Sequence, residues 1–394
     1  MQTEADARQG AGLLAWLALG WVALVAFLDT FAIVPILAPY AKRALGASEV
    51  QAGLVLSLYS LTNLVANFYS GALIDRFGRR LPMALSLWAA GGLIALYPSA
   101  LHVETLMALR ALHGATGAVF VPALFALVGE YGKHNRTGAM GGIGALIGLV
   151  ALLGPPLGGM IAKHYGESAL LWGVAGLMFV GGAAAWRLHE PAHEGDRSAR
   201  ATPLGLIRRP ALRAAYLLTL GMTALMGMLT FALPVSLAAA GYDAAYRGRM
   251  FGLLALVSIV MMVVVRRGAL LGGAYGRAQL GLGFFVVGAI ALNALSVPTG
   301  AWVAVALFGI GFGLTFPATH LTAFEHAPDT MRGAALAILH AFYSLGYVIG
   351  PAAAGRVGSD AAGYLGAVFG AAIVLATALS KRRRYDAPNL RKRS

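Results

Sequence analysis

The hydrophobic positions of this chain form long continuous runs, each long enough for an α-helix to cross the hydrocarbon core of a bilayer. The predicted spans are 12–38, 49–73, 81–98, 104–129, 138–162, 168–187, 212–238, 247–266, 278–297, 301–325, 332–356 and 362–380. The pattern therefore predicts an all-α membrane protein with twelve transmembrane helices.

The polar stretch 188–211 divides these spans into two sets of six, and we interpret it as a flexible cytoplasmic linker. Spacings recur on either side of it. Pro122 lies eight residues before Glu130, as Pro317 lies eight residues before Glu325. In each half a Gly-Pro pair also follows an arginine by 18 residues. We expect two pseudo-symmetric six-helix bundles, 1–187 and 212–394, around a central cavity, with a basic cytoplasmic tail at the end of the second.

The composition supports this class of protein. Apolar residues make up 59% of the chain and charged residues 12%, and mean hydropathy is +0.73. A soluble domain carries about 25% charged residues. The chain has no cysteine, which excludes disulfides, thiolate nucleophiles and Cys-ligated metals. The first apolar run is too long for the core of a signal peptide, and we interpret it as the first spanning helix.

The net charge of +14 is distributed as topology determinants rather than as a nucleic-acid surface. If the N-terminus is cytoplasmic, 23 Lys and Arg residues fall in cytoplasmic segments and 6 in outer ones. This asymmetry predicts that both termini are cytoplasmic. We expect basic residues in the short connections to contact lipid head groups.

The stretch 71–81, GALIDRFGRRL, joins the second and third predicted helices. Gly71 would allow close helix approach, Asp75 places a carboxylate at the helix end, and Gly78 permits a tight turn. The basic residues that would hold this turn on the cytoplasmic side are Arg76, Arg79 and Arg80. An ordinary positive-inside loop is the alternative interpretation.

Two charged residues lie deep inside predicted helices. Asp29 lies roughly 6 Å beyond the midpoint of the first helix, and Arg110 lies roughly 9 Å from the midpoint of the fourth, on the same outer side. A buried carboxylate is costly unless it is protonated, solvated or paired. We therefore predict that Asp29 and Arg110 pair and serve proton coupling. Asp29 bonded to a neighbouring backbone or hydroxyl group, and a purely structural Arg110, are the alternatives.

These motifs resemble those of the major facilitator superfamily. The 71–81 stretch is similar to that family's signature between helices two and three, and Arg110, Gly114 and Gly117 match its helix-four signature. The fifth helix, with GLVALLGPPLGG, resembles the signature of antiporters, and the wider sequence looks like the tetracycline-efflux group. The residues that carry the antiporter motif are Gly148, Gly154, Pro155, Gly158 and Gly159.

The resemblance implies a conformational latch at the cytoplasmic face, made by the 71–81 stretch, Glu130 and the start of the eleventh helix near 330–333. A helix N-terminus attracts a carboxylate, so the physics agrees with such a latch. The corresponding stretch of the second half, 266–277, has lost its acid, which puts a symmetric latch in doubt.

Polar and aromatic residues within the apolar segments are candidates for a substrate cavity, although lipid contact or helix packing is the simpler interpretation of the Met and aromatic ones. The candidates are Tyr59, Asn63, Asn67, His113, Met226, Phe231, His320, His340 and Tyr343. Nothing resembles a sugar-binding polar cluster, and no GxxxxGK[ST] nucleotide loop is present.

We therefore expect a monomeric, multi-pass transporter of the bacterial plasma (inner) membrane that exports amphipathic or lipophilic small molecules in exchange for protons. We expect no enzymatic activity, cofactor, metal or nucleic-acid partner; the expected partners are a small-molecule substrate, protons and membrane lipids. A proton-coupled nutrient symporter, a lipid or glycolipid flippase, and a sensor or scaffold on a transporter fold are the alternatives.

Overall fold

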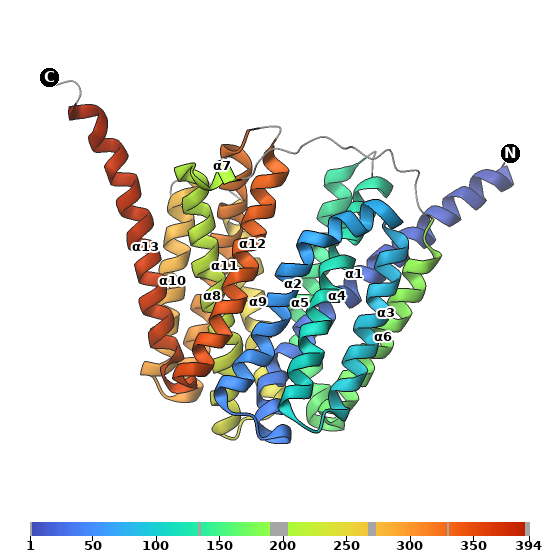
Figure 1. Cartoon of the computed structure of the whole chain (residues 1–394), viewed down its shortest axis with the longest axis horizontal. Helices are drawn as coiled ribbons and strands as arrows, with labels where there is room; N and C mark the ends of the chain where they lie inside the picture. The colour runs from blue at the N-terminus through green and yellow to red at the C-terminus, as the bar shows by residue number, and fades with distance from the viewer. Residues whose placement is uncertain (1, 133–134, 190–203, 267–272, 329–330, 391–394) are drawn as a thin grey trace. The chain divides into compact units, whose positions relative to one another are not determined.

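The structure is a computed structural model that describes residues 2–132, 135–189, 204–266, 273–328 and 331–390. The described residues contain helices and no strand, as expected for an all-α membrane protein. In chain order the helices are α1 (Gln2–Leu45), α2 (Glu49–Phe77), α3 (Arg80–Leu96), α4 (Val103–Tyr131), α5 (Arg136–Tyr165), α6 (Glu167–Arg187), α7 (Leu204–Ile207), α8 (Pro210–Ala239), α9 (Ala244–Arg266), α10 (Ala274–Ala294), α11 (Val297–His326), α12 (Arg332–Val357) and α13 (Ser359–Leu390) (Figure 1).

Each predicted span corresponds to one long helix, and the short α7 is an addition within the predicted linker. Eleven of the long helices are apolar and long enough to cross a membrane by composition alone. The exception is α2, because Gln51, Asn63 and Asn67 interrupt its apolar run. The division into bundles at 187 and 212 stays a prediction, and 190–203 of the linker lies outside the described residues.

Tight turns between helices depend on glycines in the left-handed region. Gly78 has φ +79° between α2 and α3, which confirms the turn predicted there. Gly166 after α5 and Gly358 after α12 have nearly identical angles, with φ 86° and ψ 160° against φ 85° and ψ 158°. In both turns the glycine N–H donates to the carbonyl four residues earlier. The same helix-ending turn therefore occurs in both halves of the sequence.

The chain forms two compact units, each made of more than one segment. Unit 1 consists of Met1–Ser48, Leu58–Asp196 and Tyr242–Gly252; unit 2 consists of Glu49–Ser57, Arg197–Gly241 and Leu253–Ser394. In unit 1, α3 packs against α6 and α4, while α1 packs against α5, α6 and α4. Small residues allow these approaches: a Cβ on Gly91 of α3 would lie 3.1 Å from the carbonyl oxygen of Ala175 in α6.

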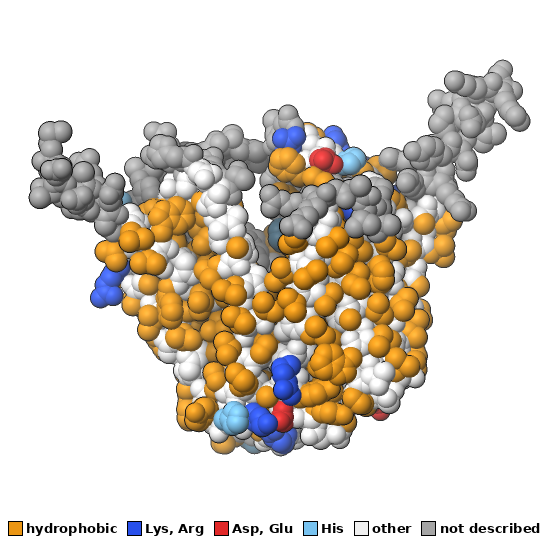
Figure 2. Space-filling model, turned by 180° about the vertical axis from the view of Figure 1, so that it is seen from behind, with side chains coloured by type: hydrophobic (Ala, Val, Ile, Leu, Met, Phe, Trp, Pro, Cys, Tyr) orange, Lys and Arg blue, Asp and Glu red, His pale blue; other side chains and the backbone are white. Residues whose placement is uncertain are grey.

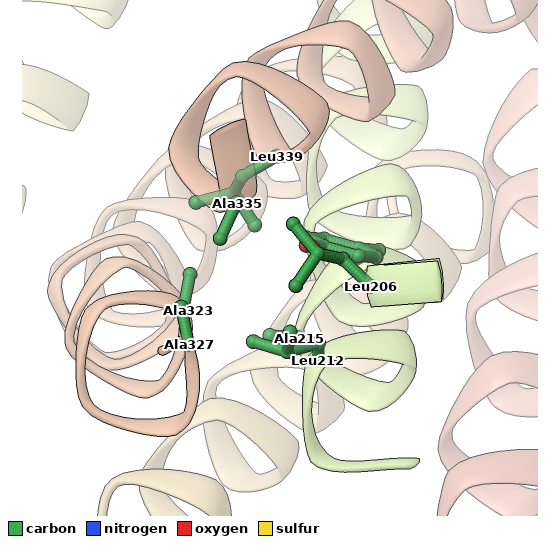
Figure 3. Close-up of a cluster of buried hydrophobic side chains, with 8 residues drawn as sticks. Leu206, Leu212, Ala215, Ala323, Ala327, Ala335 and Leu339 are labelled. Atoms are coloured by element: carbon green, nitrogen blue, oxygen red, sulfur yellow. The ribbon is translucent and has the colours of Figure 1, made fainter. Parts of the chain in front are cut away.

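Unit 2 is built around α8, the helix with the largest buried share of its span. It packs against α12, α13 and α11, and α10 packs against α11 and α13. At one end of the unit α7, α8, α11 and α12 share a hydrophobic cluster (Figure 3). Its buried members are Leu206, Leu212, Ala215, Tyr216, Ala323, Ala327, Ala335 and Leu339.

The exposed surface of the helices is largely hydrophobic (Figure 2). Phe68 is 76% exposed and Val368 is 69% exposed, and many other large apolar side chains are similarly open. In water such a surface would drive association, whereas against lipid tails it is favourable. The helices therefore present their outer faces to a bilayer.

Candidate functional site: a buried chain of hydrogen bonds in unit 1

Asp29 is buried inside α1, with 1% of its surface exposed. One carboxylate oxygen accepts a hydrogen bond from the hydroxyl of Thr30 at 2.9 Å. The other lies 3.0 Å from Nε2 of His113 on α4. The deepest acid of the chain is therefore stabilised by a histidine and a hydroxyl, which lowers the cost of burying it.

His113 continues the chain of hydrogen bonds away from Asp29. It is completely buried, and its Nδ1 lies 2.8 Å from the hydroxyl of Tyr97. Tyr97 belongs to a 3₁₀ turn that follows α3, and it is also completely buried. The oxygen of Tyr97 in turn accepts a hydrogen bond from Arg110 at 3.5 Å.

Hydrogen bonds thus link Arg110 to Asp29 through Tyr97 and His113. The direct Asp29–Arg110 ion pair expected from the sequence is not observed among the described residues, because His113 and Thr30 bind the carboxylate. The guanidinium of Arg110 also stacks over the ring of Tyr59, 4.6 Å from its centroid. His113, expected in an open substrate cavity, instead belongs to this buried chain.

The donors and acceptors of this chain fit a state with Asp29 ionised and His113 neutral. Nε2 of His113 then carries the proton and donates to Asp29, while Nδ1 accepts from the Tyr97 hydroxyl, whose oxygen accepts from Arg110. Protonating Asp29 removes its negative charge but leaves a carbonyl oxygen that can still accept from Nε2. The bond to an ionised acceptor then becomes a weaker bond between neutral groups.

Close packing of α2 on α4 holds Tyr59 against Arg110. Gly114 and Gly117 face Tyr59, and a Cβ at Gly117 would lie 2.6 Å from the Tyr59 hydroxyl oxygen. Thr62 donates to the carbonyl of Ala111 at 2.6 Å. The glycines of the predicted helix-four signature thus have a packing role here.

Asn63 and Asn67 also lie on this side of α2. Asn63 Nδ2 donates to the carbonyl of Gly114 at 3.2 Å, and Asn67 Nδ2 donates to Asn63 Oδ1 at 2.9 Å. Both predicted substrate residues therefore already use hydrogen-bonding groups within unit 1.

The 71–81 stretch forms one ion pair with the end of α4. Arg79 is buried and lies 2.6 Å from Glu130. Asp75 is exposed at the end of α2 and forms no ion pair with any described residue. Gly71 has no atom within 4 Å of its would-be Cβ, so the close approach expected there is not observed.

The other two arginines of the stretch stack on aromatic rings. Arg76 lies 5.1 Å from the centroid of Phe77, and Arg80 lies 5.2 Å from that of Trp186. Of the predicted latch, Arg79 and Glu130 are thus brought together, while the expected contact near 330 lies partly outside the described residues.

The Gly-Pro-rich part of α5 packs closely against α1 and α9. A Cβ at Gly154 would lie 3.3 Å from Phe31 Cβ, and one at Gly158 would lie 2.6 Å from the Ala32 carbonyl oxygen. Gly159 faces the backbone of Ala244.

The carbonyl of Pro155 likewise faces Gly248 of α9. Four of the five predicted antiporter-motif residues therefore have packing partners in unit 1. Gly148, the fifth, lies in α5.

Charged groups join α5 and α9 beside these glycines. Lys163 Nζ lies 2.8 Å from Asp243 Oδ2, and Asp243 Oδ1 accepts from the backbone N–H of Tyr246 at 2.7 Å. The hydrogen bond from Lys163, with that from Tyr246, holds the pKa of Asp243 below its usual value. The bridge is therefore intact at neutral pH and is lost only as the pH falls through this lowered pKa. Both side chains are about two-fifths exposed, so the pair contributes at most about 1 kcal/mol.

In unit 2 the predicted substrate residues separate into two groups. Met226 and Phe231 on α8 are buried, so these two predicted cavity residues belong to the packed helix core. His320, His340 and Tyr343 lie together on α11 and α12, with the two imidazole centroids 5.4 Å apart.

Sequence reasoning missed three residues of unit 1: Tyr97, Thr30 and Arg247. Tyr97 carries a polar hydroxyl at the end of an apolar run, and Thr30 directly follows the buried acid; both are weak signals. Arg247 counts in the sequence only as one of the six outer basic residues, but it is 4% exposed, and its Nε donates to the carbonyl of Pro35 at 3.2 Å. No group of three or more His, Cys, Asp or Glu in the described ranges could hold a metal ion.

Comparisons with known proteins agree with this architecture. A model of the Major Facilitator Superfamily matches residues 19–351. The inner membrane transport protein YajR of Escherichia coli (strain K12) is 28% identical over 356 residues, which cover 86% of this chain and 76% of YajR. The multidrug resistance protein MdtG of Yersinia enterocolitica is 30% identical over 160 residues, 39% of this chain and 38% of MdtG.

Solved transporter structures share the fold at low sequence identity. The nucleoside transporter NupG has a TM-score of 0.77 at 10% identity, covering 93% of this chain and 99% of its own. A bacterial homologue of the human lysosomal transporter Spinster has a TM-score of 0.76 at 14% identity, covering 93% and 96%. The family match over most of the chain and the shared helical fold show that this protein belongs to the major facilitator superfamily and is a multi-pass membrane transporter, not an enzyme.

Proposed function

We propose that the protein is a proton-coupled exporter of amphipathic or lipophilic small molecules, acting as a monomer in the bacterial inner membrane with both termini in the cytoplasm. The observation that carries the proposal is the buried chain from Arg110 through Tyr97 and His113 to Asp29. It is a titratable carboxylate in the interior of unit 1, with a partner that is itself titratable.

Protonation of Asp29 changes both charge and bonding in the chain. With Asp29 ionised, its negative charge offsets the positive charge of Arg110. With Asp29 protonated, the site carries a net positive charge, and the bond from Nε2 of His113 no longer has an ionised acceptor. The two protonation states therefore favour different arrangements of α1 and α4. A cargo that prefers one arrangement competes with the proton, which is the condition for exchange.

Two further features of unit 1 support export. The α5 glycines pack against α1 and α9, at the positions that resemble the antiporter signature. Arg79 and Glu130 form the buried part of the proposed cytoplasmic latch. The name of MdtG, a multidrug resistance protein, agrees with efflux of lipophilic compounds, over the part of the chain that the two proteins share.

The test is transport of a lipophilic fluorescent dye from proteoliposomes under an imposed pH gradient. Asp29→Asn keeps the shape and the acceptor oxygen but cannot titrate. We expect it to abolish gradient-driven transport while leaving dye exchange without a gradient at least partly intact. Glu104→Gln, which neutralises an exposed acid in the first turn of α4, is the matched control and should retain coupled transport.

Equal gradient-driven rates for wild type and Asp29→Asn would overturn the coupling role. Transport that follows the proton direction would contradict export and support a symporter. Movement of fluorescent phospholipid between leaflets, without dye transport, would support the flippase alternative.

A further inference from the structure

Six aromatic side chains gather on α11 and α12 within unit 2, and we call them the α11–α12 aromatic cluster. They are Phe312, Phe316 and His320 on α11, and His340, Tyr343 and Tyr347 on α12. Three of them follow one face of α11 at intervals of four residues, so their rings stack along the helix. The ring centroids of Phe316 and His320 are 4.2 Å apart, and those of Phe312 and Phe316 are 5.2 Å apart.

The cluster is open, unlike the packed aromatic residues of the same unit. Phe285 and Phe308, on α10 and α11, are almost completely buried with centroids 4.7 Å apart. By contrast, every member of the α11–α12 aromatic cluster is partly exposed, and His340 is exposed. The cluster therefore presents ring surface that the helix packing of unit 2 does not cover.

The hydrogen bond that His320 makes within α11 determines which of its ring nitrogens can accept a hydrogen bond from a ligand. Nδ1 of His320 lies 2.8 Å from the carbonyl oxygen of Phe316, which can only accept, so Nδ1 carries the proton. In the neutral ring Nε2 is then an acceptor, and no described residue donates to it. His320 lies six residues before the end of α11, roughly 9 Å inside the helix. An unsatisfied acceptor at that depth is costly against lipid, so this face suits a ligand or water that donates.

The charges around the cluster favour an uncharged ligand. No carboxylate belongs to the cluster, and Glu325, the acid of α11, lies in its last turn. A cation would gain attraction to the ring faces but no opposite charge. A flat neutral molecule would gain contact with the exposed ring surface of Phe316 and His320, together with the acceptor at Nε2.

We propose that the α11–α12 aromatic cluster binds the cargo of this transporter and selects a flat, uncharged aromatic molecule that carries a hydroxyl or N–H donor. This inference rests on the proposed export function and names the class of compound exported. Phe316 supplies exposed ring surface for contact, and Nε2 of His320 accepts the hydrogen bond of the donor.

The test uses two fluorescent probes, 2-naphthol and 2-methoxynaphthalene, in which a methyl group replaces the donor hydrogen. Their equilibrium binding to the purified full-length protein in detergent is measured without a pH gradient. We expect 2-naphthol to bind about fivefold more tightly, the effect of one neutral hydrogen bond. His320→Phe keeps a ring and removes the acceptor, so it should abolish the preference while leaving binding of 2-methoxynaphthalene unchanged. His320→Gln restores an acceptor oxygen and should recover part of the preference.

The matched control is His326→Phe. His326 lies on the same helix, and its Nδ1 also bonds to the carbonyl four residues earlier, at 3.1 Å from Thr322. It lies outside the cluster, so the preference for 2-naphthol should persist. Phe316→Leu should weaken the binding of both probes by about tenfold, because each probe loses its contact with the Phe316 ring.

Equal affinities of the two probes for the wild type would overturn the proposed selection for a ligand with a hydrogen-bond donor. A preference that survives in His320→Phe, or is lost in His326→Phe, would overturn the site. If the wild type binds as expected but no gradient drives transport, the proposed proton coupling fails and the binding site stands. If Asp29→Asn abolishes transport but substitutions in the cluster leave the affinities of both probes unchanged, the coupling stands and this site is wrong.

Discussion

At the scale of single residues, the proton coupling that we propose for unit 1 depends on the direction of each hydrogen bond in a buried chain. Tyr97 is the link that a sequence pattern does not reveal, since its hydroxyl accepts from Arg110 and donates to His113. When Tyr97 donates to Nδ1, the neutral His113 carries its proton on Nε2, the nitrogen that faces Asp29. A substitution at Tyr97 should therefore alter the hydrogen bond between His113 and the Asp29 carboxylate, although Tyr97 and Asp29 are not in contact.

Tyr97→Phe tests this directly, because it keeps the ring and removes only the hydroxyl. Nδ1 of His113 then loses its donor, so the tautomer that donates to Asp29 is no longer favoured. We expect gradient-driven dye transport to slow by about fivefold, the equivalent of one neutral hydrogen bond. Tyr131→Phe removes a hydroxyl that bonds the carbonyl of His189, outside this chain of hydrogen bonds, and should leave the rate unchanged. An unchanged rate in Tyr97→Phe would contradict the assigned bond directions.

At the scale of elements, prolines in α1 create a binding place for α9. Pro39 has no N–H, so the carbonyl of Pro35, four residues earlier, lacks its helical donor. Nε of Arg247 occupies that acceptor at 3.2 Å, and Nη1 of Arg247 donates to the carbonyl of Tyr242 at 2.8 Å. One buried arginine thus satisfies a carbonyl that the proline sequence leaves open, and it ties α9 to α1 within unit 1.

We expect Arg247→Leu to destabilise the protein by about 1–3 kcal/mol, the cost of an unsatisfied buried acceptor, in thermal unfolding of the detergent-purified chain. Arg249→Leu, two residues further on, is the control, because Arg249 is exposed and should matter little. Pro39→Ala restores the helical donor for Pro35. In that background the cost of Arg247→Leu should shrink, and equal costs in both backgrounds would show that the Pro35 carbonyl is not the reason.

At the scale of the whole molecule, alternating access requires that a small number of contacts bias one state over another. The Arg79–Glu130 pair is a candidate, since Arg79 is buried and the pair joins the end of α4 to the turn between α2 and α3. Removing one partner leaves the other charge partly buried without its counterpart, and the local structure must respond.

Arg79→Ala should therefore shift the balance of access states, and about 1.4 kcal/mol would change their ratio tenfold. The chain has no cysteine, so single cysteines introduced along α5 report accessibility without background. We expect their labelling rates to change in Arg79→Ala and not in Arg76→Ala, whose side chain lies exposed over Phe77. Identical labelling in both variants would remove Arg79 from the proposed latch.

Much of the fold could be predicted from local sequence. The apolar runs predicted the long helices because a bilayer requires an unbroken apolar stretch of fixed length, which is a property of consecutive residues. The turn at Gly78 was equally local, because its positive φ depends on a missing side chain. The helical content, the order of helices and the deep position of Asp29 thus followed from the sequence by itself.

The tertiary structure decided which groups meet. Arg110 and His113 lie three residues apart on one face of α4, about 4.5 Å in depth, so an estimate of depth could not tell which of them faces Asp29. That choice depends on how α1 and α4 are rotated against each other and on Tyr97, brought in by α3 packing on α4. Likewise the exposure of His320, against the burial of Phe231, is set by the packing of unit 2 around α8. Contacts between distant residues depend on helix rotation and packing, which the apolar pattern of a membrane helix leaves largely undetermined.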